Sequence, residues 1–259
     1  MSVERLSTML IQKIEHVYQP IWSADSLTVF GYEALVRFPI NYYEGSIERV
    51  FEWARTEGTF YDLDTRSITE AIARFSEQHW DNELLFLNVY PSTLIHMQFP
   101  AFLGTLLNTF PDIRGKVVLE LSEAIEEDYC WELPIIKERI AYIKEMGFLV
   151  ALDDVGKGGS GLQRIIEFSP DYLKLDRYFS MELSSSIEKQ QMLALFLTYA
   201  TNKMVVILEG LEEDIDLQQA QTLMVPLVQG YLLGRPQKLT TQKTIREVKP
   251  TDPNGRLHQ

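Results

Sequence analysis

Polar side chains stand at or near the ends of a series of short apolar runs. The runs cover 84–89, 117–121, 148–152, 172–175, 205–208 and 225–228. Such continuous runs are typical of strands buried on both faces of a parallel sheet. The polar residues at or near their ends are Asn88, Glu120, Asp153, Asp154, Lys174, Glu209 and Gln229, and Glu33 lies on an earlier segment. Because parallel strands end at one edge, we expect these side chains to converge.

Five carboxylates in one small volume predict a site for divalent cations. Two unit charges 4 Å apart repel by about 4 kcal/mol at an effective dielectric constant of 20, and Lys174 supplies only one positive charge. Mg²⁺ and Mn²⁺ prefer carboxylate and amide oxygens, whereas the absence of His from this set of residues argues against an imidazole-based zinc site. Two such ions about 3.5–4 Å apart suit phosphoester hydrolysis. Any one of these residues could instead simply mark the start of a loop.

The segments around these runs predict a (β/α)₈ TIM-like barrel of the α/β class. Two further strands are expected at 16–22 and 27–36, and helices at 47–57, 62–78, 131–146 and 187–202. Eight strand candidates in about 250 residues fit such a barrel. The hairpin-like first pair indicates an irregular start with one antiparallel strand. We expect a single domain over 1–248 and a fraying tail over 249–259.

Composition excludes several classes of function. The 259 residues include 24 Lys and Arg against 37 Asp and Glu, a net charge of −13, which repels nucleic acid and anionic lipid. Cys130 is the only cysteine, so no internal disulfide can form and a reducing cytoplasm is compatible. No signal peptide is evident in 1–16. The apolar stretch at 192–200 is too short to span a membrane. These features predict a cytoplasmic protein without membrane insertion.

Eight ordered motifs resemble those of the EAL-domain cyclic di-GMP phosphodiesterases over about residues 14–240. They are YQPI at 18–21, EALVR at 33–37, FLNVYP at 86–91, ELSE at 120–123, DDVGKG at 153–158, LKLD at 173–176, EGLE at 209–212 and QGYLLGRP at 229–236. The resemblance implies an enzyme that uses Mg²⁺ or Mn²⁺, two ions in all, to open cyclic di-GMP to linear pGpG.

The resemblance also implies a role for each matched residue. The matched metal ligands are Glu33, Asn88, Glu120, Asp153, Asp154 and Glu209. Lys174 matches the lysine that orients the hydrolytic water, and Glu123 matches a glutamate that steadies the loop after the paired aspartates. Arg37 and Gln19 are the candidate phosphate contacts. Gln229 matches a glutamine beside the metals and the substrate.

One loop departs from the family pattern. The family's DDFGTG becomes DDVGKG here, so Val155 replaces an aromatic residue and Lys157 replaces a threonine. Extra glycines at 158–161 add backbone freedom that must be lost when the loop orders. The altered loop keeps open the alternative of a cyclic di-GMP receptor that signals through a partner. A metal-assisted barrel enzyme acting on another substrate also stays open, because fold does not fix function. The family often dimerises near this loop, which makes a homodimer an expectation.

Overall fold

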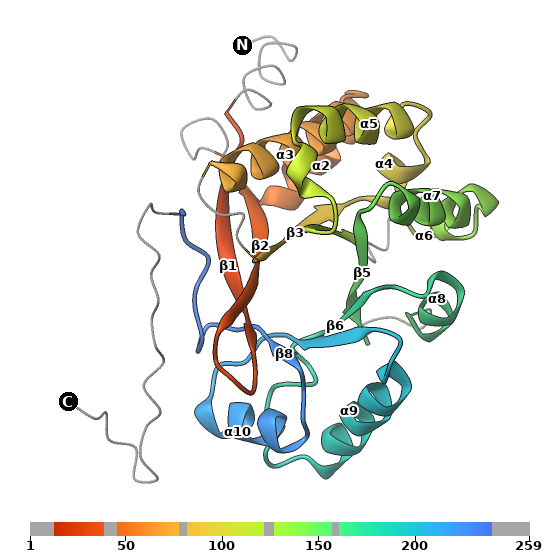
Figure 1. Cartoon of the computed structure of the whole chain (residues 1–259). Helices are drawn as coiled ribbons and strands as arrows, with labels where there is room; N and C mark the ends of the chain where they lie inside the picture. The colour runs from red at the N-terminus through yellow and green to blue at the C-terminus, as the bar shows by residue number, and fades with distance from the viewer. Residues whose placement is uncertain (1–12, 39–45, 78–81, 122–126, 157–160, 240–259) are drawn as a thin grey trace.

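The computed structural model describes residues 13–38, 46–77, 82–121, 127–156 and 161–239. Eight strands close a barrel in the order β1 to β8, with helices packed around it (Figure 1). The strands are β1 (Glu15–Ser23), β2 (Val29–Arg37), β3 (Leu84–Val89), β4 (Val117–Leu121), β5 (Leu149–Val155), β6 (Tyr172–Leu175), β7 (Val205–Leu208) and β8 (Leu227–Val228). The predicted TIM-like barrel is confirmed.

The first strand runs against both of its neighbours. β1 pairs antiparallel with β2, where Gln19 lies opposite Glu33, and antiparallel with β8, where Trp22 lies opposite Val228. The pairs from β2 through β8 are parallel. The expectation of one antiparallel strand at the start of the barrel is therefore confirmed.

The helices form the outer layer. They are α2 (Ile47–Thr56), α3 (Phe60–Ser76), α4 (Pro91–Ile95), α5 (Phe99–Thr109), α6 (Asp128–Trp131), α7 (Pro134–Glu145), α8 (Gly161–Phe168), α9 (Ile187–Ala200) and α10 (Asp214–Thr222), with a 3₁₀ turn, η1 (Pro111–Ile113). The single helix expected at 131–146 is two helices, because Pro134 has no backbone N–H to continue α6 and instead begins α7. None of the described helices has the length and apolar character needed to cross a lipid bilayer.

Strand alternation separates two apolar layers. Outward-facing strand residues pack with the helices in the main core, whereas inward-facing ones fill the barrel. The inner layer contains Ile21, Phe86, Val118, Ala151, Tyr172, Ile207 and Leu227. On each parallel strand of this set, the residue two positions further on shares the same face and is polar: Asn88, Glu120, Asp153, Lys174, Glu209 and Gln229. The inner apolar layer therefore fills the barrel beneath these polar residues, which we call the polar ring. The ring lies at the mouth of the barrel, the end where the parallel strands finish.

Candidate metal centre and substrate mouth

Lys174 lies at the centre of the polar ring and is fully buried. Its Nζ atom is 2.8 Å from Glu120 Oε1, 3.0 Å from Glu209 Oε1, 3.2 Å from Asp153 Oδ1 and 3.6 Å from Glu33 Oε1. Burial alone would lower the pKa of Lys174, but the four surrounding carboxylates raise it well above its ordinary value. The ammonium is therefore held charged at the bottom of the mouth.

Two amide side chains complete the ring. Asn88 Nδ2 donates to Glu33 Oε1 at 3.4 Å and to Glu120 Oε2 at 3.3 Å. Gln229 Nε2 donates to Glu33 Oε2 at 2.7 Å, while its Oε1 is buried and accepts no hydrogen bond from the described residues. An unsatisfied buried oxygen next to a carboxylate costs free energy unless a cation or donor group reaches it. The ring therefore contains at least one buried oxygen, Gln229 Oε1, that is available to bind a cation or a donor group.

The two adjacent aspartates would ordinarily point to opposite faces of β5. The pairing of β5 with β6 is irregular between Leu152 and Val155, and Asp154 adopts the left-handed backbone region with a φ of 54°. Asp tolerates this region better than most residues. The irregularity breaks the alternation, so that oxygens of Asp153, Asp154 and Glu209 all lie within 4.8 Å of one another.

The carboxylates outnumber the positive charge, which alters their protonation. Burial raises the pKa of Glu120 well above its ordinary value, against the opposing effect of Lys174. Burial, together with the charges of Asp153 and Glu33, raises the pKa of Glu209 to about 8 despite Lys174. Glu120 and Glu209 thus hold protons more readily than exposed carboxylates do, and the all-oxygen donor set fits Mg²⁺, Mn²⁺ or Ca²⁺.

A hollow of about 260 Å³ opens above this ring. It is lined by Gln19, Glu33, Asp154, Asp176, Arg177, Glu209, Gly210, Glu212, Gln229, Gly230 and Tyr231. A side chain at Gly230 would collide with the carbonyl oxygen of Leu211, so glycine is required where the loop after β7 packs against the end of β8. That close approach holds Gln229 at the mouth. The guanidinium of Arg235 lies 4.2 Å from the ring centre of Tyr231 at the rim.

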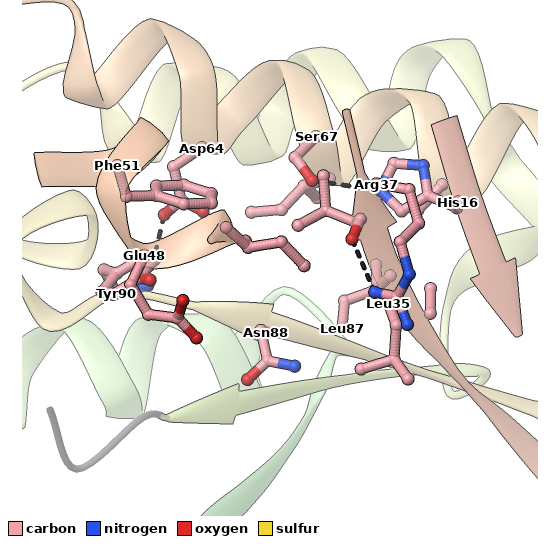
Figure 2. Close-up of a pocket in the computed structure, with 15 residues that line it drawn as sticks. His16, Leu35, Arg37, Glu48, Phe51, Asp64, Ser67, Leu87, Asn88 and Tyr90 are labelled. Atoms are coloured by element: carbon pink, nitrogen blue, oxygen red, sulfur yellow. Dashed lines mark hydrogen bonds between the residues drawn. The ribbon is translucent and has the colours of Figure 1, made fainter. Parts of the chain in front are cut away.

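A second hollow of about 170 Å³ lies beside the ring, between β2, β3, α2 and α3 (Figure 2). Arg37 and Asn88 both line it, so it adjoins the ring at Asn88. Arg37 Nη1 donates to the carbonyl of Val36 at 2.7 Å. His16 contributes from β1, and its Nε2 lies 3.0 Å from Ser67 Oγ. Arg37 and Gln19 therefore line different hollows that flank the ring.

The structure brings most of the residues singled out in the sequence into one site. Those in or bordering the ring are Gln19, Glu33, Asn88, Glu120, Asp153, Asp154, Lys174, Glu209 and Gln229. Arg37 lies in the neighbouring hollow. Glu123 and Lys157 lie outside the described residues, as does the tail at 249–259.

Sequence reasoning missed two buried carboxylates that bond to the residues following β3. Asp64 lies on α3 and accepts a hydrogen bond from the backbone N–H of Tyr90. Glu127 precedes α6 and contacts both Arg55 and Ser92. Glu127 sits within a run of three acidic residues, 126–128, and nothing in such a run marks which carboxylate is buried.

The comparisons with known proteins agree with this architecture. Residues 3–236 match the family model described as EAL domain, so the chain belongs to the EAL domain family. It is 29% identical over 230 residues to the probable cyclic di-GMP phosphodiesterase PdeN of Escherichia coli K12, a match that covers 85% of this chain and 42% of PdeN. The chain thus spans less than half the length of this relative.

Solved structures of one homologue are also similar. Klebsiella pneumoniae BlrP1 was solved with calcium and cyclic di-GMP, and matches with a TM-score of 0.77 at 26% identity. Its manganese and cyclic di-GMP complex matches with a TM-score of 0.76 at 26% identity. Each match covers 87% of this chain and 56% of BlrP1. The family resemblance expected from the eight motifs is confirmed.

Proposed function

We propose that the chain is a metal-dependent phosphodiesterase that hydrolyses cyclic di-GMP to linear pGpG. The observation that carries this proposal is the ring itself. Four carboxylates surround the buried ammonium of Lys174, Asp154 adds a fifth carboxylate beside Asp153 and Glu209, and the amides of Asn88 and Gln229 bond to carboxylates of the ring. PdeN is named as a probable cyclic di-GMP phosphodiesterase, and BlrP1 was solved with cyclic di-GMP. Water would add to one phosphorus, and the bond from that phosphorus to the 3′ oxygen would break.

The metals we propose are two Mg²⁺ or Mn²⁺ ions. Glu33, Asn88, Glu120, Asp153, Asp154 and Glu209 would hold them, and the oxygen-only donor set supports this choice. When bound, such ions acidify water and neutralise charge on a transferring phosphoryl group. The calcium and manganese in the BlrP1 complexes support a divalent cation in this fold.

The remaining side chains would bind and orient. Lys174 would hold the attacking water in line with the phosphorus, because its charged Nζ has four carboxylate neighbours that fix its position. Gln19 and Arg37 would contact phosphate oxygens from the two hollows beside the ring. Gln229 would face the metals and substrate with its free Oε1. Glu123 would steady the loop after the aspartates.

Turnover with product identification tests the proposal. Purified protein is incubated with cyclic di-GMP and Mg²⁺ or Mn²⁺, with chelator as the blank, and the products are separated by chromatography. We expect pGpG only where metal is present, and none from Asp153→Asn. Binding of the dinucleotide without hydrolysis under either metal would contradict the enzyme and identify a receptor. Hydrolysis of other phosphodiesters in preference would identify a different substrate.

We also propose that the barrel domain, residues 1–248, forms a homodimer in the cytoplasm. Helix α8, which follows the aspartate loop, exposes Leu162 and Ile166 on one face, and α9 exposes Leu195. Apolar side chains that lie together on one exposed helix face, as Leu162 and Ile166 do, favour a partner surface, and a second copy is the occupant we propose. Light scattering should show a dimer that Ile166→Glu converts to a monomer. A monomeric wild-type protein at micromolar concentration would contradict the dimer.

A further inference from the structure

The turn after β3 is held by hydrogen bonds to a carboxylate that lies outside the polar ring. Asn88 is the last residue but one of β3, and the turn that follows β3, Tyr90 to Ser92, includes the first two residues of α4. The backbone N–H of Ser92 donates to Glu127 Oε2 at 2.7 Å, and the Ser92 hydroxyl donates to Glu127 Oε1 at 2.7 Å. Both carboxylate oxygens of Glu127 therefore accept hydrogen bonds from Ser92.

Arg55 on α2 places a positive charge next to Glu127. Glu127 is 0% exposed, and its Oε1 forms an ion pair with Arg55. The Arg55 guanidinium also lies 4.0 Å from the ring centre of Phe60 at the start of α3. Since a buried carboxylate without a partner is strongly destabilising, Arg55 supplies the partner that Glu127 needs at this fully buried position.

A second carboxylate holds the same turn from α3. Asp64 is buried and its Oδ2 accepts a hydrogen bond of 3.2 Å from the backbone N–H of Tyr90. The Tyr90 ring packs against Phe51 and Phe60, with ring centres 5.1 and 5.0 Å away (Figure 2 shows Phe51, Asp64 and Tyr90 together). Two backbone N–H groups of the turn, those of Tyr90 and Ser92, are thus bound by carboxylates from separate parts of the chain.

Strand pairing alone leaves this turn unsupported. The register of β3 with β4 ends at Val89 opposite Leu121, so no ladder hydrogen bond restrains Tyr90 or Ser92. Asn88 lies one residue before that limit, and its amide reaches Glu33 and Glu120 at 3.4 and 3.3 Å. A shift of the turn would therefore rotate the end of β3 and move Asn88 relative to two carboxylates of the ring.

We propose that Glu127, paired with Arg55, is a positioning residue for Asn88. By fixing Ser92 it sets the direction in which Asn88 presents its side chain to the ring, and so the geometry of the oxygen donors. This inference deepens the proposed function and rests on it, since it matters only if the ring holds divalent cations. Groups that support metal ligands in this way commonly change metal affinity 10- to 100-fold when they are replaced.

Mn²⁺ binding, measured by electron paramagnetic resonance, tests the proposal together with thermal unfolding. In Glu127→Gln an amide N–H replaces one of the two acceptor oxygens, so one contact with Ser92 is lost, and we expect Mn²⁺ affinity to fall about ten-fold. Turnover lost at limiting Mn²⁺ should return at saturating Mn²⁺. The matched control is Glu70→Gln, which removes the carboxylate of the Arg66–Glu70 pair on α3 and should leave Mn²⁺ affinity unchanged.

Ser92 provides a second test that leaves the Glu127 charge in place. Ser92→Ala removes only the hydroxyl contact and should weaken Mn²⁺ binding by a few-fold, whereas Ser92→Thr keeps a hydroxyl and should bind as the wild type does. If both Glu127→Gln and Ser92→Ala lower the unfolding temperature but bind Mn²⁺ like the wild type, the positioning role is wrong while the proposed function stands. A folded wild-type protein that binds no Mn²⁺ overturns both.

Discussion

Lys174 and Glu120 form a fully buried ion pair at the centre of the barrel mouth, with Nζ 2.8 Å from Oε1 and side-chain exposures of 1% and 0%. The lysine stands two residues after Tyr172 and the glutamate two residues after Val118, both members of the inner apolar layer. The strand alternation that fills the barrel therefore also delivers the charged pair to its mouth. Three more carboxylates lie within 3.6 Å of the same ammonium.

Replacing Lys174 by Met should abolish turnover and destabilise the metal-free protein. The substitution leaves Glu120 without its buried partner, and this typically lowers the free energy of unfolding by about 3–5 kcal/mol. Chemical denaturation in chelator should show that loss, and added Mn²⁺ should recover part of it by supplying positive charge. Lys144→Met is the control, because its ion pair with Asp171, in which the side chains are 31% and 34% exposed, should contribute less than about 1 kcal/mol to stability. Wild-type turnover in Lys174→Met would contradict its role.

Replacing either aspartate of β5 by Asn should reduce turnover at least 100-fold without unfolding the protein. Asn also tolerates the left-handed conformation of Asp154, so Asp154→Asn removes charge while keeping the backbone. Circular dichroism should be unchanged and Mn²⁺ affinity reduced for both variants. Asp112→Asn, on η1 ahead of β4, lies at the opposite end of the barrel and should behave as the wild type. Unaltered Mn²⁺ affinity in both β5 variants would rule out their role as ligands.

Arg37→Gln should raise KM for cyclic di-GMP about ten-fold and change kcat less. Its guanidinium lies in the hollow beside Asn88, where it would grip phosphate without touching the attacking water. Steady-state kinetics at saturating Mn²⁺ measures both constants. The comparison variant is Arg114→Gln, whose guanidinium bonds the carbonyl of Met146 near the start of β5. A fall in kcat at constant KM would show that Arg37 acts on the reaction step instead.

The affinity for Mg²⁺ should rise with pH between 7 and 9. Burial, with the charges of Asp153 and Glu33, raises the pKa of Glu209 to about 8 in the metal-free protein. The carboxyl is mostly protonated at pH 7, so a cation must displace a proton, and this cost disappears above pH 8. Calorimetry should show affinity increasing about ten-fold for one displaced proton. Glu209→Gln has no such proton and should give a flatter profile at lower affinity.

His16 should make the fold less stable in mild acid. Burial lowers the pKa of His16 to about 4, whereas the unfolded chain has the ordinary value of about 6.5. Because the folded pKa is depressed, the stabilising contribution is present above pH 6.5 and is lost as pH falls toward 4. Between pH 7 and pH 5 the free energy of unfolding should fall by about 2 kcal/mol from this residue. In His16→Gln, which can still bond Ser67, denaturation should show a smaller decrease over that interval.

Most of the barrel follows from local sequence patterns. The apolar runs at 84–89, 117–121, 172–175 and 205–208 coincide with β3, β4, β6 and β7. Such runs must be buried on both faces, and this requirement leaves little freedom in their placement. The last strand is only Leu227–Val228 because antiparallel pairing with β1 ends there. Pro134 divides a continuous amphipathic pattern that, by periodicity alone, predicts one helix.

The site was predictable wherever polar residues end strands, and not where contacts depend on tertiary packing. Asn88, Glu120 and Glu209 each lie at or next to the end of an apolar run, so their convergence follows from parallel strand ends. The turn of Asp154 into the left-handed region has no counterpart in composition, because Asp occurs commonly in ordinary strand ends too. Glu127 and Arg55 are 72 residues apart, and no local pattern links them.

The reversed direction of β1 determines at which end of the barrel this strand begins. Glu15 pairs with Arg37, the last residue of β2, so the strand begins at the rim where the other strands finish. A fluorescent label attached just ahead of Glu15 would consequently report on ligands that enter or leave the polar ring. A parallel first strand would have delivered the same label to the far, closed end of the molecule.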